Sequence, residues 1–142
     1  ANYHLYRCSD DKWIALGSLE PKFWQGVCAL LNKPDWIPRM LPVPEMVISL
    51  KKDLQEIFLT KTRDEWVAAA TPLDVCLTPI LDLDEVEKDI HLNQREMFIE
   101  VEHTDYGKLK GINQPFKFSE TPAKPSWGAP LMGEDNLLLN EM

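Results

Sequence analysis

Glu20 stands where a carboxylate is best placed for chemistry, between Leu19 and Pro21 with Phe23 and Trp24 close behind. Apolar neighbours desolvate a carboxyl group and raise its pKa, which is how proteins prepare a group for proton transfer. The alternative is a local role, because the positive end of a helix dipole stabilises an anion at a helix start. The residues alone leave both interpretations open.

Other titratable residues offer less. The histidines, His4, His91 and His103, are far apart and lack the HxxxH or HExxH spacing of metal sites, so no metal site is predicted. The acidic run at residues 81–85, "LDLDE", resembles the start of a calcium loop but lacks the required glycine and distal glutamate. We expect it to cap a helix, with Asp84 as the capping residue.

The three cysteines, Cys8, Cys28 and Cys76, form no CxxC pair, and their number is odd. A disulfide framework is therefore not expected, and a reducing compartment is favoured. All three lie among apolar residues, which predicts buried and inert thiols. No Ser-His-Asp order, G-x-S-x-G elbow or phosphate-binding glycine loop occurs in the sequence.

Length and charge limit the possible functions. The 142 residues, 44% of them apolar, suit one globular domain, and the net charge of −8 argues against a nucleic-acid duplex or an anionic membrane as partner. No membrane-length apolar run or signal peptide is visible, so we expect a cytoplasmic protein. The chain lacks an initial methionine and stops within a helix-like stretch at residues 134–142, which predicts a piece of something larger.

Hydrophobic periodicity predicts an α+β domain of short helices with a small antiparallel sheet. Proline-rich residues 32–44 are expected to form a rigid loop, and Thr62–Glu65 has the form of a capping box. Residues 97–103 and the stretch after them form an expected β-hairpin. The expected strands are 3–8, 12–19, 75–81, the hairpin and a short one at 116–118; the expected helices are 21–32, 46–58, 62–70 and one from residue 83.

Six stretches, in order along the chain, resemble one family. They are "YRCSDDKWIALGSLEPKFW", "TKTRDEWVAAA", "LDVCLTPILDLDEV", "HLNQREMFIEVEH", "INQPFKFSETPA" and "APLMGEDN". Together they resemble the small domain of family III CoA-transferases, the CaiB/BaiF group that includes alpha-methylacyl-CoA racemase. The third contains the family's Asp-x-Cys-x-x-Pro-[Val/Ile]-Leu pattern.

The sequence departs from the family pattern mainly at turns. The usual Asp-Gly-Lys is Asp10-Asp11-Lys12, and the usual Arg-Gly-Met is Arg95-Glu96-Met97. A glycine before the Asp-x-Cys segment is replaced in "ATPLD", and Gly-Glu-His becomes Gly-Glu-Asp at residues 133–135. These changes put local loop geometry in question, not the family.

The resemblance implies that residues 1–103 form the small domain and 104–142 a segment that returns toward a large Rossmann-like domain, which this chain lacks. It implies two interlocked chains as a homodimer, with each active site between the large domain of one subunit and the small domain of the other. Glu20 would hydrogen-bond a catalytic histidine of the large domain. Gly17, Ser18 and Leu19 would line the thioester end of an acyl-CoA, which is the substrate, with no tightly bound cofactor.

Two classes of function follow from the resemblance. The first is an acyl-CoA enzyme: a transferase that moves CoA between carboxylic acids through an aspartyl-CoA thioester in the large domain, or else a racemase or epimerase that transfers the proton alpha to the thioester. The second is a non-catalytic fragment or assembly module, whose exposed tryptophans and leucines would mark where the missing domain docks.

Overall fold

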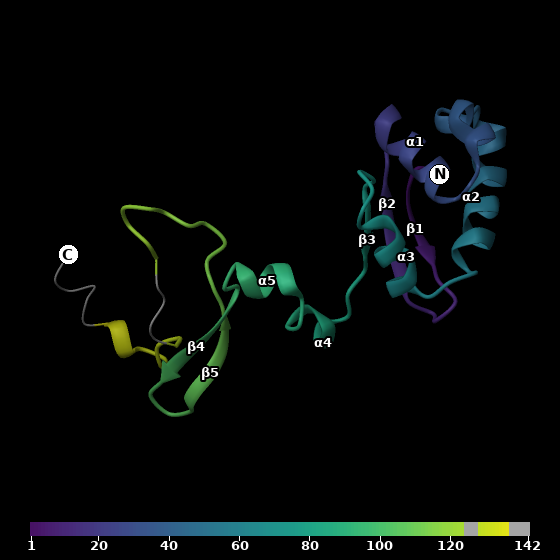
Figure 1. Ribbon diagram of the computed structural model, residues 1–142. Helices are drawn as coiled ribbons and strands as arrows, with labels where there is room; N and C mark the ends of the chain where they lie inside the picture. Colours follow the sequence, from purple (N-terminus) through teal and green to yellow (C-terminus); the bar gives the residue numbers. More distant parts are fainter. Residues whose placement is uncertain (124–127, 137–142) are drawn as a thin grey trace. The chain divides into compact units, whose positions relative to one another are not determined.

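The computed structural model describes residues 1–123 and 128–136 (Figure 1). The chain divides into two compact units, Ala1–Leu81 and Asp82–Met142. Each unit has its own helices and its own antiparallel sheet. The expected boundary after residue 103, which concerned the return toward a large domain, stays a prediction. The expected helix start at 134–142 extends outside the described residues.

The first unit is built on a three-stranded sheet. Strands β1 (Tyr3–Arg7), β2 (Trp13–Gly17) and β3 (Leu77–Pro79) are antiparallel neighbours in the order β1-β2-β3. Successive side chains in a strand point to opposite faces. The buried residues of the inner face are apolar, and they are Tyr6, Ile14, Leu16 and Leu77.

Four helical segments accompany this sheet. They are α1 (Pro21–Leu30), the 3-10 helix η1 (Pro34–Met40), α2 (Pro44–Phe58) and α3 (Arg63–Ala70). Figure 1 shows α2 beside β1 and α3 beside β3. The helices and the C-cap residue of α1, Leu31, contribute to the core; the helical residues are Trp24, Val27, Cys28, Trp36, Leu50, Leu54, Phe58, Trp66 and Ala70.

Buried tryptophans join these helices. The indole nitrogen of Trp24 donates to the carbonyl of Trp36 at 3.0 Å, and that of Trp66 donates to the carbonyl of Phe58 at 2.9 Å. Each ring therefore buries its apolar area without leaving its N–H unpaired. Truncating a buried ring of this size typically costs about 3–5 kcal/mol. Both rings are thus covered within the unit itself.

The structure confirms the predicted start of α3 but contains a helix, η1, where a loop was predicted. The Thr62 N–H donates to the Glu65 carboxylate at 2.8 Å, and the Glu65 N–H donates to the Thr62 hydroxyl at 3.3 Å, which confirms the capping box. The loop expected at 32–44 instead contains η1, with Pro38 inside it. Proline fixes φ near the value of a 3-10 helix, so this proline-rich stretch can coil without leaving its rigid geometry.

One side chain of α2 pairs with the edge of the sheet. The Gln55 side-chain amide donates to the Arg7 carbonyl at 2.8 Å, and its oxygen accepts the Arg7 N–H at 3.1 Å. Arg7 lies on β1, which is an edge strand. The glutamine therefore occupies one hydrogen-bonding position of that edge.

The second unit contains the helices α4 (Leu83–Val86) and α5 (Ile90–Gln94) and a two-stranded sheet of β4 (Phe98–His103) and β5 (Gly107–Ile112). The hairpin confirms the sequence prediction. The expected cap at Asp84 is wrong. Asp82 is the N-cap of α4, and its N–H donates to the Glu85 carboxylate at 3.0 Å.

Residues 116–118 form no strand in the structure, contrary to expectation. A strand needs a neighbour to receive its backbone hydrogen bonds. Among the described residues of this unit, the sheet consists of β4 and β5, and residues 116–118 pair with neither strand.

Two of the departures from the resembled family, Asp11 and Glu96, fall on positions with left-handed backbone. Asp11 has φ of 64° and Glu96 has φ of 53°, where the family carries glycine. A side chain at such φ costs on the order of 1–2 kcal/mol, less for aspartate. These two turns therefore have a left-handed backbone although neither position is glycine.

We predict that Glu96→Gly raises the free energy of unfolding by up to about 1 kcal/mol, because relief of the left-handed strain outweighs the added freedom of the unfolded chain. The control is Glu100→Gly within β4, which also removes an exposed ion pair to a lysine. It should lower stability, because glycine weakens a strand interior. Urea unfolding measures both, and a destabilised Glu96→Gly protein would contradict the strain.

Candidate functional site

The stretch Gly17–Glu20 forms a corner between β2 and α1. The Gly17 N–H donates to the Cys76 carbonyl at 2.8 Å, and the Ser18 N–H donates to the Asn2 carbonyl at 2.8 Å. The Asn2 side chain returns a hydrogen bond to the Ser18 carbonyl at 3.2 Å. Two segments that are distant in the sequence, at Asn2 and at Cys76, therefore fix the backbone of the corner before α1 begins at Pro21.

Glu20 is the N-cap residue of α1, but its carboxylate caps nothing. Its backbone is extended, and its side chain accepts no hydrogen bond from the helix. The side chain is exposed, so of the two interpretations that the sequence left open, desolvation by its neighbours does not occur in this unit by itself. Leu19 beside it is also exposed, at 57%. Of the apolar neighbours of Glu20, Trp24 is buried in the core and Leu19 is exposed to solvent.

Ser18 has the opposite environment. Its side chain is fully buried, and among the described residues its hydroxyl oxygen has no hydrogen-bond partner. A buried hydroxyl without a partner costs on the order of 1–3 kcal/mol. In this structure Ser18 offers no side-chain atom to a ligand, so contact with a thioester would fall to Gly17 and Leu19. The binding role of the three residues stays a prediction.

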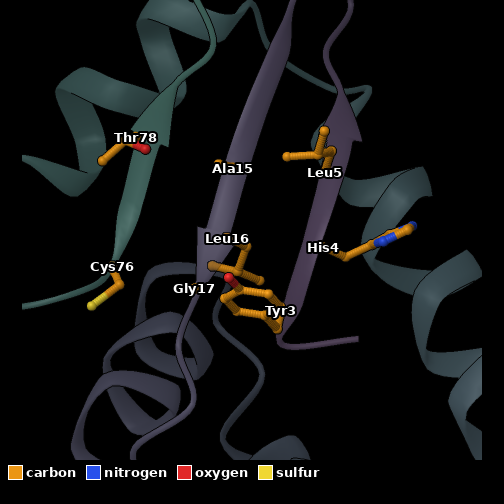
Figure 2. Close-up of a pocket in the computed structure, with 8 residues that line it drawn as sticks. All are labelled: Tyr3, His4, Leu5, Ala15, Leu16, Gly17, Cys76 and Thr78. Carbon is orange, nitrogen blue, oxygen red and sulfur yellow. The ribbon is translucent and has the colours of Figure 1, made fainter.

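A hollow of about 450 Å³ lies on the outer face of the sheet and reaches Gly17 (Figure 2). The sequence did not single out the residues around it, although the alternation in β1 and β2 predicts which side chains share a face. Cys76 was expected to be buried, but it is only half-buried and lines this hollow. The lining residues are Tyr3, His4, Leu5, Ala15, Leu16, Gly17, Cys76 and Thr78.

A close approach between α1 and the chain before β3 holds Cys76 in place. A Cβ atom at Gly26 would lie 2.6 Å from a methyl carbon of Val75. Only glycine allows α1 to pack this tightly against residues 74–75, which lead directly into Cys76. Gly26 is thus a positioning residue for the wall of the hollow next to Gly17.

The two buried thiols, those of Cys8 and Cys28, have low reactivity. Burial raises the pKa of the Cys8 thiol to about 11, with a smaller contribution from the Asp10 charge. Burial also raises the pKa of the Cys28 thiol to about 11, and the Asp35 charge adds to it. Because the thiolate is the nucleophile, both groups are nearly unreactive at neutral pH. The three cysteines are free.

Within residues 1–123 and 128–136, no cluster of three or more His, Cys, Asp or Glu side chains could hold a metal ion. In the same residues, no helix is both long and apolar enough to cross a membrane.

Comparison with known proteins gives consistent matches. Residues 1–136 match CoA-transferase family III. The chain is 33% identical over 137 residues to human alpha-methylacyl-CoA racemase, covering 93% of this chain and 34% of that protein. It is 29% identical over 116 residues to formyl-CoA:oxalate CoA-transferase of Rhodopseudomonas palustris strain BisA53, covering 78% of this chain and 27% of that protein.

Among solved structures, the chain resembles Rv3272 from M. tuberculosis, with a TM-score of 0.77 and 20% identity over 96% of this chain and 39% of that one. This likeness supports the fold: an α+β unit with short helices and small antiparallel sheets. The chain therefore spans well under half the length of the relatives that it matches.

We predict that Ser18→Ala raises the free energy of unfolding by about 1 kcal/mol, because it removes a buried hydroxyl that has no partner. Ser9→Ala, at an exposed serine, is the matched control and should change stability by less than about 0.5 kcal/mol. Denaturant titration measures both. A loss of more than about 1 kcal/mol in Ser18→Ala would mean that the hydroxyl has a partner in solution.

The thiols give a second prediction. At pH 8 a chromogenic aromatic disulfide should react quickly with Cys76 and slowly with Cys8 and Cys28, because that pH is far below the pKa of the two buried thiols, about 11. Raising the pH toward 11 should speed the slow phase. Cys76→Ser should remove the fast phase alone, and equal rates at the three thiols would contradict the burial.

Proposed function

Because the chain belongs to CoA-transferase family III, we propose that it is the small-domain part of an acyl-CoA enzyme. The protein would transfer CoA between carboxylic acids through an aspartyl-CoA thioester on a large domain outside this chain. The observation that carries its role is the exposed carboxylate of Glu20, which the helix behind it does not use. The acyl-CoA is a substrate, and no tightly bound cofactor is proposed.

The geometry of Glu20 suits a partner from another domain. Among the described residues, its carboxylate has no hydrogen bond or ion pair. Its backbone, however, is held by the neighbouring bonds of Gly17 and Ser18. A carboxylate that must orient an imidazole of another domain needs both properties: a fixed position and free acceptor oxygens. It would accept the N–H of one ring nitrogen and so raise the basicity of the other.

We propose further that this pairing forms across two interlocked chains, with the small domain of one subunit facing the large domain of the other. The removal of water on assembly would then strengthen the hydrogen bond between Glu20 and the imidazole. It would also desolvate the carboxylate, which this unit by itself leaves exposed.

A second activity, racemisation or epimerisation at the carbon alpha to the thioester, has its own support. The match to the human racemase covers more of this chain than the match to the transferase, 93% against 78%. Two acid/base groups on opposite faces of the alpha carbon would carry out that reaction. Incubating the complete protein with an acyl-CoA in D₂O separates the two: a racemase exchanges the alpha hydrogen, whereas a transferase needs a carboxylate acceptor.

We predict that Glu20→Gln in the complete protein lowers kcat at least about tenfold, equivalent to about 1.4 kcal/mol, without changing the melting temperature. The amide keeps the shape of the side chain but cannot stabilise a protonated imidazole. Glu45→Gln is the matched control, since Glu45 also adjoins a proline in the first turn of a helix and is exposed. Turnover of Glu20→Gln within about twofold of the unchanged protein would contradict the role.

A further inference from the structure

The hollow on the outer face of the sheet is a groove along β2. Ala15 and Gly17, the smallest side chains of the face, form its floor, because they alternate with the buried Ile14 and Leu16. The register places Leu5 opposite Ala15 on one side and Thr78 opposite Ala15 on the other. Larger side chains on both flanking strands therefore form the walls of the groove, and the small residues of β2 form its floor.

One end of the groove meets the candidate site. Tyr3 pairs with Gly17 across β1 and β2, and Figure 2 shows its ring reaching from β1 toward Gly17. An aromatic ring beside a strand glycine covers backbone that has no side chain of its own. Because β2 ends at Gly17, a ligand lying along the groove would arrive directly at the corner Gly17–Glu20.

The walls carry no acidic or basic side chain. Alternation sends the ring of His4 to the inner side, where it contacts Tyr6 with ring centroids 5.3 Å apart, so His4 contributes only its backbone. The side chains that line the groove are those of Tyr3, Leu5, Ala15, Cys76 and Thr78. A carboxylate ligand such as oxalate would find no cation to pair with here.

Three further hollows in the structure have a different character. Their volumes are about 270, 190 and 120 Å³, and each is lined by at least two charged side chains. The groove of about 450 Å³ lies within the range of small-molecule sites, which are mostly apolar with a few polar groups.

We propose that this groove binds the aliphatic acyl chain of a CoA thioester, with the thioester end at Gly17 and the chain running along β2 over Ala15. The inference rests on the proposed function, and it goes further by naming the substrate class: thioesters of apolar acids several carbons long, rather than of formic or oxalic acid. Each methylene that leaves water strengthens binding by about 0.8 kcal/mol, or about fourfold.

The test compares CoA, acetyl-CoA and dodecanoyl-CoA by calorimetry on the complete protein. We expect dodecanoyl-CoA to bind at least about tenfold more tightly than acetyl-CoA, as burial of two or more additional methylenes requires. Ala15→Phe, which fills the floor, should weaken the binding of dodecanoyl-CoA more than that of acetyl-CoA and so reduce that preference by about tenfold or more. Ala15→Val should give a smaller loss and serves if the larger ring prevents folding.

Ala68→Phe is the matched control, because Ala68 is exposed on α3 and outside the groove. It should change none of the three affinities. Absence of binding by all three ligands would contradict the proposed function itself. If CoA and acetyl-CoA bind but dodecanoyl-CoA binds no more tightly, the groove is not the acyl-chain site. The same follows if Ala15→Phe leaves the preference for dodecanoyl-CoA intact. Neither result would contradict the proposed function. A change in subunit assembly with Ala15→Phe would also overturn the acyl-chain site, since the face would then be a protein interface.

Discussion

Strand β2 is hydrogen-bonded to β1 on one side and to β3 on the other. This pairing determines which residues of the first unit lie in the core and which line the groove. Because side chains alternate, the same pairing sends Ile14 and Leu16 into the core and leaves Ala15 and Gly17 on the outer face. A shift of one residue would exchange these two sets. The burial of the two large residues therefore also holds the floor of the groove and the position of the corner that follows it.

Much of this fold was predictable because its signals are local. The capping box at Thr62 and Glu65 needs only four residues, and the β4–β5 hairpin needs only an alternating run and a turn. The 3-10 helix at Pro34–Met40 was not predicted, since prolines fix φ both in irregular loops and in such a helix. The cap of α4 was placed two residues too late, because Asp82 and Asp84 both suit a helix start and only the backbone distinguishes them.

The site was predictable only in part. Sequence located the Gly17–Glu20 corner, but it could not show that Ser18 is buried while Glu20 is exposed, since that depends on Asn2 and Cys76 reaching the corner from elsewhere in the chain. The partial exposure of Cys76 depends in the same way on how closely α1 approaches at Gly26. A run of apolar residues predicts burial, but long-range contacts determine which residues of the run remain at the surface.

The amide of Gln55, paired with the backbone of Arg7, has a consequence for how the protein behaves among its own copies. An edge strand with free N–H and C=O groups is a template on which another chain can add a strand. The other edge is the three-residue β3, which ends in a proline that cannot donate. One edge is thus partly occupied and the other is short, so growth of this three-stranded sheet into a continuous intermolecular sheet is disfavoured.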